Sequence, residues 1–228
     1  MFYIHERMTF MTIKEAIKHR HSIRRFKEAP LSDEVRAKLS ALAAECSCDE
    51  VSIRLVCGDR ECFDTFLARY GKFKNAYNYF ALVSKKDQDT DEKAGYMGQK
   101  LVLKVEELGL GTCWVGGTYS KGKCKAELAE DEKIICIIAV GEPDEQGTKH
   151  RSKPMDKICT VKEEDMPTWF KNGVIGALYA PTAMDQQKFT ISLDGDEAVI
   201  TAGKAPFAKI DLGIVKYNFE AASGHEVR

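Results

Sequence analysis

The chain has 228 residues, of which 44% are hydrophobic and 30% are charged, and its formal net charge is −1. This composition suits a globular protein with a sizeable core, and it provides no basic field that would attract nucleic acid or an anionic membrane surface. We therefore expect a small-molecule partner, and neither nucleic acid nor a membrane.

The first ten residues, MFYIHERMTF, lack the basic-then-apolar order of a signal peptide, and no apolar run approaches the length of a membrane span. A cytoplasmic protein is expected, and Met11, where the helical pattern begins, is a candidate start. The eight cysteines are scattered through a chain too large to need disulfides, so reduced thiols are expected. Cysteines and histidines show no metal-ligand spacing, and no metal is expected.

Hydrophobic periodicity predicts a short helix within residues 11–21, with Arg20 and His21 in its last turn. Ser32 is expected to cap a second helix over residues 31–47. Apolar runs and helical spacing then predict strands over 51–58, 79–86, 133–143, 188–195 and 197–202, and further helices over 62–73, 91–109, 169–180 and 208–224.

Residues 144–168 are polar, contain two prolines and are expected to form a long connector. Such connectors inside compact domains are often functional. The order of elements predicts an α/β or α+β fold.

The segment GLGTCWVGG (109–117), after the long helix, is expected to be a loop whose backbone a ligand approaches closely. A helix C-cap followed by a tight turn is the alternative, and it would explain Gly109 better than the pair Gly116 and Gly117. The run RHSIRRF (20–26) has a similarly plain alternative, a basic helix end favoured by the helix dipole.

Together, RHSIRRF, GLGTCWVGG, KHR (149–151) and APTAMDQQ (180–187) resemble the FMN-dependent nitroreductase family over nearly the whole chain. The resemblance implies an α+β fold in which helices flank a mixed, antiparallel-rich central sheet. In ordinary members the segment like APTAMDQQ closely follows the arginine motif and reaches across from a partner subunit. Here it comes about 155 residues later.

That departure resembles a compact branch of the family first seen in Thermotoga, in which one chain imitates the dimer. Residues 11–150 would then form an FMN-binding half, and residues 151–228 a shortened second copy that completes a single flavin site. Internal matches such as Gly98 with Gly213 agree with a degenerate duplication, although chance explains them equally well. A monomer is favoured, and further dimerisation stays open.

The resemblance implies several groups of FMN contacts. Guanidinium and ammonium groups bind phosphate oxygens well, and the expected cradle is Arg20, Ser22, Lys149 and Arg151. His21 would contact the ribityl chain or ring, and Arg24 would lie at the pyrimidine edge. The ring would lie against Trp114, Val115, Gly116 and Gly117, and the second half would contribute Pro181, Thr182, Ala183, Asp185 and Gln187.

Two of these assignments leave alternatives open. Asp185 stands where the family usually has asparagine, and an ionised aspartate cannot donate a hydrogen bond. The segment containing Lys74, Asn75, Tyr77 and Tyr79 would reach the pyrimidine edge or would be a solvated loop.

The resemblance implies an FMN-dependent oxidoreductase that takes hydride from NADH or NADPH at flavin N5 and reduces a nitroaromatic, a quinone or a similar small acceptor by a ping-pong cycle. No protein residue is then required as a general acid, because the flavin supplies the chemistry. The alternatives are a flavin-binding carrier or sensor without efficient turnover, or a specialised flavoenzyme of the reductive dehalogenase or flavin-destroying type.

Overall fold

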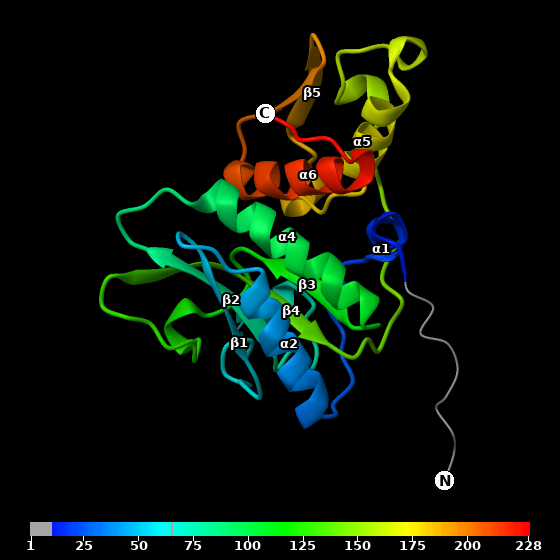
Figure 1. Ribbon diagram of the computed structural model, residues 1–228. Helices are drawn as coiled ribbons and strands as arrows, with labels where there is room; N and C mark the ends of the chain where they lie inside the picture. Colours follow the sequence, from blue (N-terminus) through cyan, green and yellow to red (C-terminus); the bar gives the residue numbers. More distant parts are fainter. Residues whose placement is uncertain (1–10, 65) are drawn as a thin grey trace.

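The computed structural model describes residues 11–64 and 66–228. Figure 1 shows a central sheet with α2 and α4 against it, and a second group of elements in which α6 lies across α4. The helices are α1 (Ile13–His19), α2 (Asp33–Glu45), α3 (Phe66–Tyr70), α4 (Asp91–Glu107), α5 (Thr168–Leu178) and α6 (Ala208–Ser223). The strands are β1 (Ser52–Val56), β2 (Tyr79–Lys85), β3 (Gly111–Val115), β4 (Glu132–Gly141), β5 (Phe189–Asp194) and β6 (Glu197–Ala202).

The central sheet has the order β1-β2-β4-β3, and its neighbouring strands are all antiparallel. β2 and β4 lie in the middle of the sheet, and their residues 79–83 and 134–141 are apolar, which suits strands covered on both faces. Phe80, for example, pairs with Ile138, while Tyr79 pairs with Ala139. The expectation that the apolar run in 133–143 forms a central strand is confirmed.

Alternate residues of these strands enter two cores, because successive side chains of a strand point to opposite faces. Leu82 and Ile138 belong to the core that α2 and α4 cover. Ala81 and Ile137 belong to the other core, which the segments around Phe63 and Tyr119 cover.

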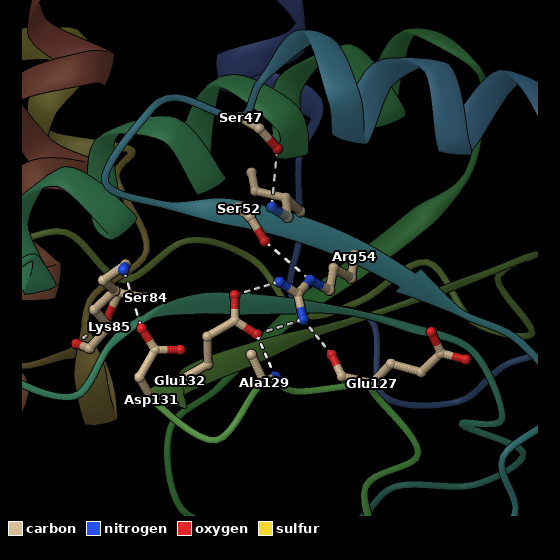
Figure 2. Close-up of polar contacts among 10 residues, drawn as sticks. Ser47, Ser52, Arg54, Ser84, Lys85, Glu127, Ala129, Asp131 and Glu132 are labelled. Carbon is tan, nitrogen blue, oxygen red and sulfur yellow. Dashed lines mark hydrogen bonds and ion pairs between the residues drawn. The ribbon is translucent and has the colours of Figure 1, made fainter.

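Figure 2 shows how the edge strand β1 is tied to the start of β4. Arg54 of β1 donates to both carboxylate oxygens of Glu132, at 2.9 and 2.6 Å. The Ala129 N–H donates to the same carboxylate at 2.8 Å, and the ion pair with Arg54 lowers the pKa of Glu132. This bidentate pair fixes the turn that leads into β4.

α5, α6 and the β5–β6 hairpin lie beyond α4, and the apolar core runs from the central sheet into this part without a break. α4 and α6 cross closely through two glycines. A Cβ on Gly95 would collide with the Ile210 carbonyl, and a Cβ on Gly213 would collide with the Glu92 carbonyl. Each glycine thus meets the residue three positions before the other glycine, as a local twofold axis would require.

Local sequence rules explain several boundaries. Thr12 and Glu15 form a capping box at the start of α1, and Ser32 accepts from the Val35 N–H at the start of α2. The helix expected over 62–73 is only five residues long as α3. The connector 144–168 contains two short 3-10 turns, at Met155–Lys157 and Glu163–Asp165.

The expectation of a loop at GLGTCWVGG was wrong for its middle, because residues 111–115 form the edge strand β3. Trp114 turns toward α4, where Gly98 leaves room for its indole ring. Gly111 lies against the Ile23 side chain, with 2.7 Å between that side chain and the place of a Cβ. These glycines therefore serve packing within the fold.

Across the part of the chain that the structure describes, no helix combines the length and apolarity needed to cross a bilayer. Within the same residues, no group of three or more histidine, cysteine, aspartate or glutamate side chains could hold a metal ion. All eight cysteines are free thiols.

Candidate functional site

A cleft of about 200 Å³ lies where the end of α1, the connector and the segment after α5 meet. It brings together three segments that are far apart in the sequence, and one of them belongs to the second part of the chain. Its lining comprises Arg20, His21, Ser22, Arg24, Thr148, Lys149, His150, Arg151, Ser152, Leu178, Ala180, Pro181, Thr182, Met184 and Asp185.

The end of α1 places the arginine motif in this cleft. The helix ends at His19, two residues earlier than a last turn containing Arg20 and His21 requires. The Arg20 N–H still donates to the Ala16 carbonyl at 2.9 Å, and the chain then turns to the edge of β3, where the Ile23 N–H donates to the Thr112 carbonyl at 2.9 Å. These backbone bonds direct the Arg20 side chain inward.

Arg20 is the most unusual charged group of the cleft. It is only 4% exposed, and its Nε has no hydrogen-bond partner. Burial lowers the pKa of Arg20 to about 10, although the nearby Cys113, Glu106 and Asp185 favour its charged form. An incompletely satisfied, buried guanidinium is energetically unfavourable without an anion, so the cleft is suited to a negatively charged ligand.

Two histidines form one wall of the cleft. The His21 and His150 rings stack with 4.7 Å between centroids, and Tyr179 packs edge-on against His150 at 4.9 Å. Burial, with Arg20 and His21 nearby, lowers the pKa of His150 to about 4, and its buried Nε2 has no partner. His150 is therefore neutral at pH 7, whereas Lys149 and the three arginines of the lining carry positive charge.

The opposite wall is a strained turn after α5. Met184, Asp185 and Gln187 all have positive φ angles, between 44° and 55°. Left-handed backbone at non-glycine residues is uncommon, and it is often found where a site fixes the chain. Asp211 at the start of α6 holds this turn, because both of its carboxylate oxygens accept from the Ala183 N–H, at 2.9 and 3.1 Å.

The side chains of this turn differ in how free they are. The Gln187 side chain is buried and committed, since its amide donates to the Leu178 carbonyl and accepts from the Lys153 N–H. The Thr182 hydroxyl accepts from the Gln187 N–H at 3.0 Å. Asp185 lines the cleft, and burial raises its pKa while Arg151 and Arg20 lower it.

The residues of β3 lie outside this cleft. The Trp114 indole donates to Gln99 at 3.2 Å, and Val115 is buried in the core on the other face of the sheet. Gly116 faces the ring of Phe207, whereas a Cβ on Gly117 would meet no atom within 4 Å. Contacts between these residues and a flavin stay predictions.

The segment 74–79 runs beside the arginine motif, since the Phe26 N–H donates to the Lys74 carbonyl and Asn75 donates to the Phe26 carbonyl. The Tyr77 hydroxyl donates to Asn75. The expectation for Tyr79 was wrong, because it lies fully buried in β2 and donates to Asp59 at 2.6 Å.

The structure thus gathers the predicted residues Arg20, His21, Ser22, Arg24, Lys149, Arg151, Pro181, Thr182 and Asp185 around one cleft. Trp114, Val115, Gly116, Gly117, Ala183 and Gln187 lie outside its lining. Sequence reasoning assigned no role to His150 or Asp211. His150 lies within the KHR motif, whereas Asp211 is an acidic residue in the first turn of α6, among buried residues that are mostly apolar.

The chain resembles known proteins both in its sequence family and in its fold. Residues 12–223 match the model of a family described as "putative TM nitroreductase". A solved "putative nitroreductase" from Thermotoga maritima has a TM-score of 0.71 at 22% identity, covering 97% of this chain and 88% of its own. No curated protein matches the sequence.

Two further solved structures match part of the chain. A "putative nitroreductase" in complex with FMN from Desulfovibrio desulfuricans has a TM-score of 0.52 at 21% identity, covering 68% of this chain and 98% of its own. Nitroreductase A from Vibrio parahaemolyticus has a TM-score of 0.52 at 18% identity, covering 69% and 78%. At these identities the structures show a shared fold, and they confirm the expected α+β class.

Proposed function

The chain belongs to the nitroreductase family that its residues 12–223 match, and we propose that it binds FMN in the cleft and uses NADH or NADPH to reduce a small organic acceptor. Family membership makes it an oxidoreductase. The flavin, the reductant and the acceptor, such as a nitroaromatic or a quinone, are the proposed part.

The observation that supports FMN is the buried Arg20, whose Nε has no partner. A phosphate monoester carries nearly two negative charges at pH 7, and a guanidinium can donate two parallel hydrogen bonds to its oxygens. Arg20 would bind the phosphate, and Arg24, Lys149 and Arg151 supply further positive charge around the same cleft. Ser22 adds a hydroxyl donor. The residues present therefore fit an anionic cofactor.

The protein would orient and shield this cofactor. FMN bound here would supply the two-electron chemistry that links the nicotinamide to the acceptor, while the residues of the cleft would hold its phosphate. The turn, which Asp211 anchors at Ala183, would form the wall opposite the arginines. Neutral His150 can donate or accept a hydrogen bond without adding charge.

We further propose that one chain builds this site from two halves, residues 11–150 and 151–228. The cleft combines residues of both halves, and the reciprocal contacts of Gly95 and Gly213 resemble a subunit interface. These contacts relate the two helices by 118 positions, which differs from the shift of 115 that aligned Gly98 with Gly213. A degenerate duplication would produce both the composite cleft and the reciprocal contacts between α4 and α6.

The test is a titration of purified protein with FMN, followed by absorbance, and then addition of NADH or NADPH under nitrogen. We expect saturation near one FMN per chain and bleaching of the flavin absorbance by the nicotinamide. Arg20→Met should weaken binding, whereas Arg36→Met on the exposed face of α2 should not. Absence of FMN binding would overturn the proposal, and two FMN per chain would overturn the single composite site.

A second candidate, a flavin carrier or sensor with poor turnover, is favoured by one observation. Phe207, at the start of α6, has a positive φ of 62° and lies against Gly116 at the end of β3. If the flavin ring passes beside Gly116, the Phe207 ring would cover the flavin. FMN binding with slow NADH oxidation that Phe207→Ala accelerates would support the carrier, whereas rapid turnover by the wild type would exclude it.

A further inference from the structure

A buried carboxylate joins two loops on the face of the sheet opposite α2 and α4. Asp59 is fully buried, and its Oδ1 accepts from the N–H groups of Glu61 and Cys62, at 3.1 and 3.2 Å. Its Oδ2 accepts from the Lys125 N–H at 3.2 Å and from the Tyr79 hydroxyl at 2.6 Å. One side chain therefore fixes the backbone of both loops.

Two more contacts hold the same loops together. The Ser120 N–H donates to the Cys62 carbonyl at 3.0 Å, and the Lys125 N–H also donates to the Tyr79 hydroxyl at 3.0 Å. Because Cys62 and Cys124 lie in or directly beside these anchored peptide units, the loops cannot separate without breaking several buried hydrogen bonds.

The two anchored loops present their thiols to each other. The Cys62 side chain belongs to the core on this face of the sheet, and Cys124 packs against the same core. Cys62 is fully buried, whereas Cys124 is partly exposed. A disulfide requires Cα atoms about 4.4 to 6.8 Å apart, and the N–H groups of Cys62 and Lys125 hold the two segments close together by donating to the same Asp59 carboxylate.

The two thiols differ in acidity. The hydrogen bond with Cys62 and the Ala126 N–H lower the pKa of Cys124, against the effect of burial and of Asp59. The same hydrogen bond and burial raise the pKa of Cys62. The thiolate is the reactive form of cysteine, so the partly exposed Cys124 is the group that a solvent oxidant would meet.

We propose that Cys62 and Cys124 form a reversible redox pair that hydrogen peroxide converts to a disulfide. The Cys124 thiolate attacks one peroxide oxygen, so that the O–O bond breaks, hydroxide leaves and Cys124 becomes a sulfenic acid. Cys62 sulfur then attacks the Cys124 sulfur, and the S–O bond breaks. The departing hydroxide takes up the thiol proton of Cys62 and leaves as water.

This pair lies outside the cationic cleft, and its oxidation does not depend on the proposed flavin chemistry. The bond would join the loop after β1 to the segment after β3, which begins with Gly116 and Gly117. Oxidation would therefore reduce the freedom of the chain that follows the edge strand.

The experiment treats the full-length protein with hydrogen peroxide, blocks free thiols and analyses a tryptic digest under non-reducing conditions. We expect peptide 61–69 joined to peptide 124–125, with the loss of two hydrogen atoms and reversal by dithiothreitol. Cys57→Ser, which removes a similarly half-buried thiol, should leave this product unchanged. Each of Cys62→Ser and Cys124→Ser should abolish it.

A second readout does not depend on the cross-link. In Cys62→Ser the sulfenic acid at Cys124 has lost its resolving thiol, so a dimedone reagent should label Cys124 more strongly than in the wild type. Should Cys62→Ser fail to fold, as judged by thermal melting, the wild-type digest still decides. Peroxide that oxidises other cysteines first, or that gives a disulfide with a different pairing, would overturn the proposal.

Discussion

Replacing Arg20 with methionine should stabilise the protein without ligand and weaken its binding of FMN. Burial lowers the pKa of Arg20 from its ordinary value to about 10. Each pKa unit corresponds to about 1.4 kcal/mol, so keeping this group charged costs about 3 kcal/mol. The cost is fully present below pH 10 and declines only above it, as the guanidinium begins to lose its proton.

Methionine retains most of the aliphatic packing and carries no charge. For a chain of this size, about 3 kcal/mol corresponds to a rise in Tm of roughly 6 to 12 °C. Hydrogen bonds to charged groups contribute about 1.5 to 3 kcal/mol, so the affinity for FMN should fall roughly 10- to 100-fold.

Differential scanning fluorimetry with and without FMN, together with a fluorescence titration, measures both effects. The matched control is Arg151→Met, because Arg151 lies in the same cleft but is exposed. It should leave Tm nearly unchanged and weaken binding only a few-fold. A lower Tm for Arg20→Met would refute the reasoning, since Arg20 would then be a structural residue rather than one held ready for an anion.

Three further predictions concern the support of this cleft. Gly213→Ala drives a Cβ into the Glu92 carbonyl and should lower the free energy of unfolding in urea by about 3 kcal/mol or more. Gly122→Ala, whose Cβ meets no atom, should change it by less than about 0.5 kcal/mol, and equal effects would contradict the close crossing. Burial raises the pKa of Asp211 to about 6, so its contribution to stability falls as the pH rises from about 4 to about 6. Asp211→Asn should therefore be more stable than the wild type by up to about 3 kcal/mol at pH 7 and not at pH 4, and a difference independent of pH would contradict the raised pKa. Gln187→Ala removes two buried hydrogen bonds and should lower the free energy of unfolding by about 2 kcal/mol or more, whereas an unchanged thermal melting curve would show that the turn holds without them.

The fold could be predicted where the signal is local. Ser32 caps α2 because its hydroxyl accepts from a backbone N–H three residues on, and Gly109 follows α4 with a φ of 73°. The run in 133–143 is apolar without alternation, which indicates burial on both faces of a strand. Each of these features depends on residues close together in the chain.

The edge strand β3 shows where this reasoning fails. Glycine lowers strand propensity, so Gly111 made the segment resemble a loop. Glycine is needed at position 111 because the Ile23 side chain, from another part of the chain, packs directly over Gly111. Similarly, Trp114 required room that Gly98 of α4 provides. A packing partner 16 or 88 positions away leaves no periodic trace in the strand itself.

The cleft combines local sequence signals with contacts between residues that are distant in the chain. Its arginines and its Pro-Thr turn belong to short motifs that the sequence displays, but the groups that fix them come from elsewhere. Asp211 holds Ala183 from 28 positions away, and His150 stacks on His21 across 129 positions. A third contact, between the rings of His150 and Tyr179, joins residues 11–150 to residues 151–228. Here the close crossing of α4 and α6 brings the second part of the chain onto the first, so a mutation that separates these helices should impair the cleft together with the fold.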